Sequence, residues 1–434
     1  MNDENRGPVT SAHRISSLDV IRGVALFGIL LMNIVGFGLP MAYENPTISG
    51  GADGLNLLAW KINALFFEGT MRGLFSVLFG AGVVLMTSRA EARDPSINVA
   101  DIYFRRNLWL IAFGVVHAWL LLWTGDILYI YGIAGMFLFV FRKVSARSLI
   151  ILSVVVLAST ALKDVYAYAQ TVTTYEESQI AQALLDSGEE LDEEQQQAID
   201  AWQEEVDNSR PTQEEIDELV AGKKGGYFSN IAINAEGIVN RQSYVLYMYS
   251  LWDALGMMLI GMALLKLGIL NAERSTRFYL GMMAVGYGIG CSVNAYEINL
   301  LLSNNFDALA SAQFYMSYDA GRVPVTMGHV GLVMLICRKG WLSWLTSRIA
   351  AVGRMALTSY VTHTVICAFI FFGIGFAMFG ELQRYQLYYV VFGIWVLQLI
   401  VSPIWLKHYR FGPLEWAWRS LTYNKRQSMQ RGSS

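Results

Sequence analysis

The sequence predicts an all-α fold, a polytopic membrane bundle of about ten transmembrane helices with a small acidic helical insertion. Hydrophobic residues make up 54% of the 434 residues and charged residues only 15%, whereas a typical soluble domain is about 25% charged. The mean hydropathy is +0.38. Apolar runs recur that are long enough to cross about 30 Å of hydrocarbon. This composition argues against a soluble enzyme, a disordered chain and a nucleic-acid-binding protein.

The apolar runs give the expected spans in chain order. We expect helices at roughly 18–39, 66–87, 107–123, 127–141, 148–167, 244–265, 278–300, 320–337, 355–379 and 388–406. The eighth is the weakest, because Asp319 and Arg322 lie at its start.

The acidic charge is concentrated in one segment. Residues 168–243 hold 17 acidic and 4 basic residues, a net charge of −13, whereas the rest of the chain carries 18 acidic and 28 basic residues. We therefore divide the chain into a five-helix membrane part (1–167), an acidic insertion (168–243) and a second five-helix membrane part with an interfacial tail (244–434). Apolar residues at helical spacing within 175–220 predict two or three short helices there.

Basic residues indicate how the bundle is oriented. They recur in every second connection, at 88–106, 142–147, 266–277 and 338–348. The short intervening connections hold only Lys61 and Arg384. By the positive-inside rule, both termini lie in the cytoplasm. Residues 168–243 then lie outside, which for a bacterial plasma membrane means the periplasm.

Cysteine usage and nucleotide motifs exclude several kinds of site. Cys291, Cys337 and Cys367 are scattered through apolar stretches without a CxxC pair, so neither disulfides nor a zinc site are expected, and we expect no metal. The chain has no Walker motif and no GxGxxG after a strand, which argues against nucleotide-driven pumping.

The first span carries polar residues on one helical face. Asp19 and Arg22 are three residues apart, and Asn33 lies within roughly 20° of the same face, about 16 Å further along the axis. Polar groups in a membrane helix normally face inward. These residues could form a substrate site. Alternatively, they have a structural role, in which Asp19 and Arg22 form an ion pair and Asn33 forms a hydrogen bond to a neighbouring helix.

Five motifs in order resemble a known family. They are LDVIRGVALFGILLMN, FSVLFGAG, FGVVHAWLLLWTGDILYIYGIAG, GRMALTSY and RFGPLEWAWRSLTY. Together they resemble the YeiB family of multispanning bacterial membrane proteins, whose C-terminal half is described as a domain of unknown function. The first motif also resembles the first helix of the transmembrane acyltransferase superfamily.

The resemblance to that superfamily implies a reaction. Its lysosomal member, heparan-alpha-glucosaminide N-acetyltransferase, is similar at Asp19, Arg22, Gly23 and Asn33. Such enzymes move an acyl group from cytosolic acyl-CoA to an acceptor across the membrane. Their catalytic histidine follows the asparagine closely, but the corresponding stretch PMAYENPTISG contains none. A base must therefore be sought elsewhere.

His117 is the leading candidate for that base. Histidine titrates near neutral pH, and His117 lies nine residues before Asp126 in a tight connection that makes the flanking helices antiparallel neighbours. A nearby carboxylate can orient the ring and stabilise the imidazolium. The alternative is a packed histidine between helices. His329 and His363 also lie in spans but fall in no catalytic motif.

Further polar groups are expected to line an outward-facing cavity. The groups at similar depth are Glu68, Arg72, Asp253, Glu297, Asp319 and Arg322. Glu68 and Arg72 are also spaced as an ion pair. Tyr131 follows the His117–Asp126 connection and is a further substrate-binding candidate. On the inner side, Arg22 and Arg354 are expected to hold donor phosphates, with Arg105 and Arg106 explained at least as well by the positive-inside rule.

Two functions compete. The first is a membrane acyltransferase with acyl-CoA as donor, His117, Asp126 and Asn33 as catalytic residues, and a small-molecule, glycan or lipid acceptor. The second is a transporter or lipid-binding protein without chemistry. A pure scaffold ranks last, because it gives the intramembrane charges no role. The sequence leaves open whether the chain forms a homodimer.

Overall fold

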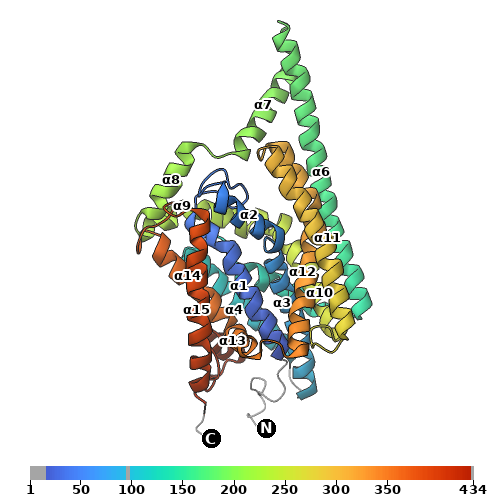
Figure 1. The fold of residues 1–434 in the computed structure, drawn as a ribbon, viewed down its shortest axis with the longest axis vertical. Helices are drawn as coiled ribbons and strands as arrows, with labels where there is room; N and C mark the ends of the chain where they lie inside the picture. Colours follow the sequence, from blue (N-terminus) through green and yellow to red (C-terminus); the bar gives the residue numbers. More distant parts are fainter. Residues whose placement is uncertain (1–15, 94–97, 432–434) are drawn as a thin grey trace.

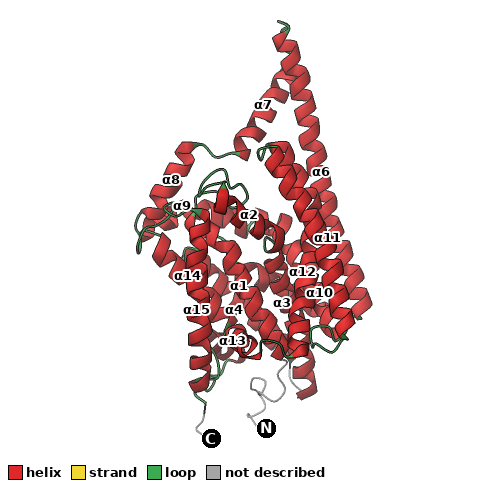
Figure 2. Ribbon diagram, viewed as in Figure 1, coloured by secondary structure: helices red, strands yellow, loops and turns green. Residues whose placement is uncertain are grey.

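The computed structural model describes residues 16–93 and 98–431, and it confirms an all-α membrane bundle (Figures 1 and 2). The helices are α1 (Ser16–Gly38), α2 (Gly54–Phe66), α3 (Thr70–Arg93), α4 (Val99–Trp119), α5 (Leu128–Leu138), α6 (Ala146–Asp186), α7 (Glu193–Ser209), α8 (Gln213–Lys224), α9 (Tyr227–Gln242), α10 (Leu251–Lys266), α11 (Thr276–Ser303), α12 (Ala308–Lys339), α13 (Ser343–Arg354), α14 (Ala356–Phe371), α15 (Arg384–His408) and α16 (Pro413–Tyr423). A 3-10 turn, η3 (Phe139–Phe141), follows α5, and a π-helical turn, η4 (Leu246–Ser250), precedes α10. Within the described ranges there is no β-strand.

Six helical runs in the described part of the chain are long and apolar enough to cross a membrane. They are Ser16–Gly38, Gly54–Ala92, Ala146–Asp186, Tyr227–Lys266, Ala308–Lys339 and Arg384–His408. The pair α13–α14, bent by 84°, makes a seventh if it counts as one span. α4, α5 and α11 fall outside this set, so the expected number of ten stays a prediction.

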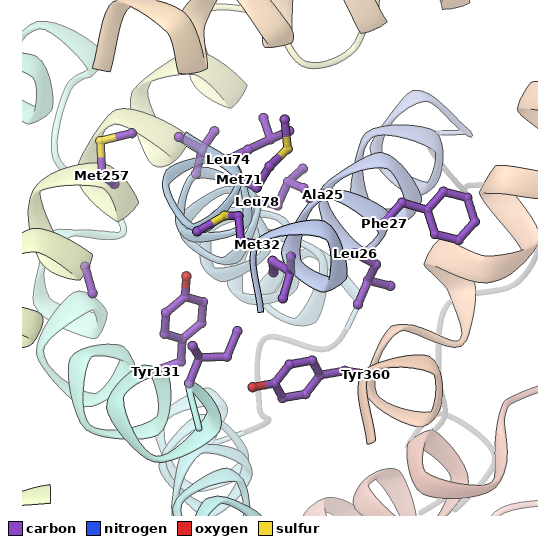
Figure 3. Packing of buried hydrophobic residues seen from close by; sticks show 14 of the residues in the cluster. Ala25, Leu26, Phe27, Met32, Met71, Leu74, Leu78, Tyr131, Met257 and Tyr360 are labelled. Carbon is purple, nitrogen blue, oxygen red and sulfur yellow. The ribbon is translucent and has the colours of Figure 1, made fainter. Parts of the chain in front are cut away.

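α1 is the central helix of the bundle. In its most apolar stretch 72% of the residues are buried, against 17% for α6 and 28% for α15. A helix that is apolar all round is buried on every side, and α1 packs against α3, α13, α14 and α15. Met71 of α3 packs against Gly28 of α1, and Figure 3 shows Met32 of α1 with Met71 and Leu78 of α3 among the residues of this core. The exposed apolar residues of α6, such as Val154 and Leu162, suit contact with lipid.

The two membrane parts share one core. α10, from the second part, packs against α3 and α6 of the first. The contact is close enough to require glycine, since a Cβ at Gly80 would lie 1.9 Å from the carbonyl oxygen of Met258, and one at Gly261 would lie 1.8 Å from that of Val77. Such direct backbone approach is typical of helix pairs in membranes.

The acidic insertion begins as a continuation of a membrane helix. α6 runs unbroken for 41 residues, well past the expected end of its span at residue 167. α7 folds back against it, with the rings of Tyr175 and Trp202 4.8 Å apart. In Figure 1 this hairpin projects from one end of the bundle, called here the insertion end. The start of α1 and the end of α15 lie at the opposite end, the terminal end.

The C-terminal helix α16 is built into the terminal end, where we expected an interfacial anchor. The Trp418 indole donates to the carbonyl oxygen of Arg106 over 2.9 Å, and the Arg106 guanidinium lies 4.3 Å from the Trp418 ring centroid. The buried Glu415 carboxylate accepts bonds from the backbone N–H groups of Leu357 and Thr358 over 2.6 and 3.1 Å. It thereby satisfies free donors at the start of α14.

Lys223 docks the end of α8 onto the bundle. Its ammonium group is buried, donates to Asn234 Oδ1 over 2.6 Å and lies 4.5 Å from the Phe372 ring centroid. Its carbonyl oxygen accepts from the N–H of Gly373 over 2.9 Å. Burial disfavours the charged form and lowers the pKa of Lys223 from its ordinary value of 10.5 to about 8.

This burial predicts a stability change at alkaline pH. Between about pH 8 and pH 10.5 the unfolded chain binds a proton at Lys223 that the folded chain has lost, so stability rises with pH across this window. Below pH 8 the cost of burying the charge is present in full. Thermal unfolding of the purified protein should show this rise, and the Lys223→Met variant should lack it. Lys407→Met, an exposed control, should keep the rise; equal profiles for all three proteins would contradict the prediction.

Candidate functional site

A solvent-accessible cavity lies at the insertion end of the bundle. It has a volume of about 890 Å³. Its walls come from the loop after α1, from α2 and the turn that follows it, and from α11, α12 and the connection between them, together with Ser209 of α7. The 890 Å³ includes open solvent at the mouth, and a concave wall with apolar faces and a few convergent polar groups is typical of small-molecule sites.

Carboxylates and aromatic rings share the cavity wall. Glu44, Glu68 and Glu297 all belong to the lining, together with Trp60 and Tyr315. The Tyr315 hydroxyl donates to Glu44 Oε2 over 2.7 Å. Glu297, which is buried, accepts a hydrogen bond from the Ser317 hydroxyl over 2.6 Å. The wall therefore combines apolar faces with fixed acceptors.

A network of charges around the buried Arg322 adjoins the cavity. Arg322 lines the cavity and is 2% exposed; it forms ion pairs with Asp319 on its own helix and, over 2.5 Å, with Asp253 of α10. Arg72 of α3 lies 3.4 Å from the other oxygen of Asp253 and donates to the Tyr318 hydroxyl over 3.2 Å. The structure thus brings together the predicted residues Arg72 and Asp253.

Glu68 and Tyr131 occupy different surroundings. Glu68 lines the cavity from the turn before α3, and in the described chain Arg72 forms its ion pair with Asp253, not with Glu68 as the spacing had suggested. Tyr131 is buried outside the lining, where its hydroxyl lies 2.6 Å from the Ser76 hydroxyl and donates to the carbonyl oxygen of Arg72. Tyr131 therefore supports the backbone beneath the charged network.

His117 and Asp126 contact each other directly. His117 Nδ1 lies 2.7 Å from Asp126 Oδ1, and Nε2 lies 2.8 Å from the Thr364 hydroxyl of α14. Asp126 also accepts hydrogen bonds from the N–H groups of Leu128 and Tyr129 at the start of α5. His117 is 1% exposed and lies outside the cavity lining. The arrangement can orient a general base, and it also ties the α4–α5 hairpin to α14.

The other two intramembrane histidines are buried as well. His329 lies 2.9 Å from the Tyr287 hydroxyl and 2.7 Å from the carbonyl oxygen of Phe66. His363 Nε2 lies 3.0 Å from Gln398 Oε1. Neither belongs to the cavity lining.

The first-helix pair lies near the terminal end. Arg22 Nη1 donates to Asp19 Oδ1 over 3.0 Å and to the carbonyl oxygen of Gly353 over 3.3 Å. Arg354 ends α13 at the 84° bend into α14. α1 and α13 touch backbone to backbone here, since a Cβ at Gly23 would lie 2.2 Å from a carbonyl oxygen of α13. The predicted donor residues Asp19, Arg22 and Arg354 therefore border one helix break.

Asn33, the remaining predicted residue, is half-buried on α1. Its side chain forms no hydrogen bond within the described part of the chain. Sequence reasoning missed Glu44 and Asn45, because the loop after α1 was searched only for a histidine. It also missed Thr364, whose separation of 247 residues from His117 leaves no local signal.

Truncation of His117 tests whether it supports the fold. His117→Ala leaves the Thr364 hydroxyl without its partner, removes one of the hydrogen bonds of Asp126 and opens a cavity, so unfolding should become easier by about 1–3 kcal/mol. Thermal unfolding measures this. His408→Ala, at the exposed terminal end, is the control and should change little. Unchanged stability in His117→Ala would contradict the structural role.

Comparison with known proteins identifies the family. The family described as "Protein of unknown function (DUF418)" matches residues 264–425. The chain is 27% identical over 426 residues to "Uncharacterized protein YxaH" of Bacillus subtilis, covering 96% of each chain. It is 30% identical over 417 residues to "Uncharacterized protein YeiB" of Escherichia coli, covering 94% of this chain and 95% of that protein. Similarity of this extent along the whole chain shows that it belongs to the YeiB family.

Proposed function

We propose that this chain is an integral membrane acyltransferase of the bacterial plasma membrane. In this proposal, acyl-CoA docks at the cytoplasmic face and the acceptor occupies the cavity. The observation that carries the proposal is the cavity itself, since it holds three carboxylic acids inside a membrane bundle. Ionisable groups at such depth are costly unless they serve a substrate or a proton.

The orientation follows from charge. The terminal end carries the basic connections and the insertion end the acidic segment 168–243. By the positive-inside rule, the terminal end is cytoplasmic and the insertion is periplasmic. The cavity then opens toward the periplasm, and the Asp19–Arg22 pair faces the side where acyl-CoA is found.

The donor site lies at the α13–α14 break. Arg22 and Arg354 supply guanidinium groups, which suit phosphate through their planar fork. Asp19 positions Arg22 through the 3.0 Å hydrogen bond. Asn33 lies on the same helix about 16 Å further along its axis, where its side chain is placed to bind the thioester.

Proton transfer is assigned to Glu68. The neutral acceptor amine or hydroxyl bonds to the acyl carbon as the thioester C–S bond breaks, Glu68 takes the acceptor's proton, and that proton then passes through water to the CoA thiolate, which restores the Glu68 carboxylate. Glu68 is chosen because it lines the cavity, whereas both ring nitrogens of His117 are already hydrogen-bonded within the protein. His117 and Asp126 then act as positioning residues that hold α5 and α14.

Transport is the second candidate, and one feature favours it. Broken helices are typical of secondary transporters, where the break provides a binding site, and α13 and α14 meet at 84° beside Arg22. A transporter would bind its substrate without consuming acyl-CoA. The donor experiment below therefore separates the two functions.

Cysteine labelling tests the orientation. Asp200→Cys, within α7, should react with a membrane-impermeant maleimide added to intact spheroplasts. Arg277→Cys, at the terminal end, should react only after the membrane is opened, because it lies in the cytoplasm. The opposite pattern at the two sites would overturn the orientation.

Acetyl-CoA binding tests the donor site. The purified protein in nanodiscs should be thermally stabilised by acetyl-CoA, because a ligand of the native state raises apparent stability. Arg22→Ala and Arg22→Lys should each weaken binding by about tenfold, since lysine lacks the guanidinium fork. Arg277→Ala, an exposed control, should bind normally. No stabilisation of the wild-type protein by acetyl-CoA would count against the acyltransferase and for transport.

A further inference from the structure

We propose that the cavity at the insertion end binds a small organic ammonium ion that also carries neutral hydroxyl groups. As a statement about the acceptor, this rests on the proposed acyl transfer. As a statement about binding, it rests on the cavity alone.

The charge of the cavity lining favours a cationic ligand. The lining holds three carboxylic acids, Glu44, Glu68 and Glu297, and one guanidinium, that of Arg322. Arg322 is already paired with Asp253 and Asp319, so its charge is balanced outside the lining. Carboxylates removed from bulk water need a positive partner. An ammonium ion placed among the three acids provides it.

Polar atoms of the cavity lining that lack a hydrogen-bond partner favour a ligand that also carries neutral hydroxyl oxygens. Asn45 Nδ2, Asn63 Oδ1 and Arg322 Nη1 have no hydrogen-bond partner in the described chain. All three residues line the cavity, and they are 7%, 6% and 2% exposed. Buried polar atoms are normally satisfied. Two of these atoms are donors and one is an acceptor, a set that hydroxyl groups complement and that an alkyl diamine does not.

The aromatic walls fit a cation better than an anion. Trp60 and Tyr315 stand beside Glu44: the Trp60 indole donates to the Glu44 carbonyl oxygen over 3.1 Å, and the Tyr315 hydroxyl donates to its carboxylate. Aromatic faces attract ammonium groups. A ligand carboxylate would instead meet three acids, and the only lining guanidinium is already shared by two aspartates.

Three compounds with one carbon skeleton test the inference. They are serinol (2-amino-1,3-propanediol), which is a cation with two hydroxyls, glycerol, which is neutral, and serine, which is a zwitterion. Binding to the full-length protein in nanodiscs is measured by calorimetry and by thermal unfolding. Serinol should bind at least about tenfold more tightly than glycerol or serine. Equal binding of serinol and glycerol, or tighter binding of serine, would overturn the inference.

Variants locate the binding. Glu68→Gln and Glu297→Gln keep side-chain size and remove one charge, and each should weaken serinol binding by about tenfold. Glu236→Gln removes an exposed charge from α9 and is the matched control. Asn63→Leu guards against misfolding, because it removes an unsatisfied buried group and should not lower stability. It should still weaken serinol binding by about threefold or more. Wild-type affinity in both glutamate variants would place the ligand elsewhere.

The experiment separates this inference from the proposed function. Acetyl-CoA is added to each mixture, and acetylated serinol and free CoA are measured by mass spectrometry. If serinol binds but no acetylated product forms, the acyltransferase proposal is contradicted and the proposed ammonium site stands. If acetyl transfer to another acceptor is found but serinol does not bind, the proposed ammonium site is contradicted and the acyltransferase proposal stands.

Discussion

The ion pairs around Asp253 join three helices beside the cavity. The buried Arg322 of α12 pairs with Asp253 of α10, whose side chain is 21% exposed, and Asp253 is shared with Arg72 of α3. Removing the partners of Arg322 would leave a buried guanidinium charge without compensation, which is costly. Each helix must therefore keep its register relative to the other two. The cavity adjoins this network, so the same ion pairs fix the positions of the helices that form its walls.

A second polar cluster fixes the other side of the bundle. Asp126 accepts hydrogen bonds from His117 and from two N–H groups at the start of α5. His117 continues the chain of contacts to Thr364 of α14. A carboxylate that satisfies several donors at once is held in one position. This explains how a helix hairpin joined by a short loop keeps its angle to α14 in a bundle whose other contacts are mostly apolar.

Local spacing explains what could be predicted from sequence, and long-range packing explains the rest. Asp19 with Arg22, and His117 with Asp126, are close in sequence, and helix geometry or a tight connection forces each pair together. Arg322 and Asp253 were each visible in the sequence as charges in spans, but their pairing was not, because no periodicity relates two helices. α6 was expected to end near residue 167. Its sequence changes there from apolar to acidic but contains no glycine or proline to stop a helix. The cavity combines a loop with four helices, which no single stretch of sequence encodes.

The unbroken α6 helix has a mechanical consequence. At about 1.5 Å per residue its 41 residues extend roughly 60 Å, about twice the thickness of the hydrocarbon layer. The outer half of α6 is thus a stiff rod that projects beyond the bilayer. From its tip, α7 leads back to Ser209 at the cavity and to Arg210, which donates to the carbonyl oxygen of Asn305 beyond α11. The α6–α7 hairpin thus connects a helix of the bundle directly to the lining of the cavity.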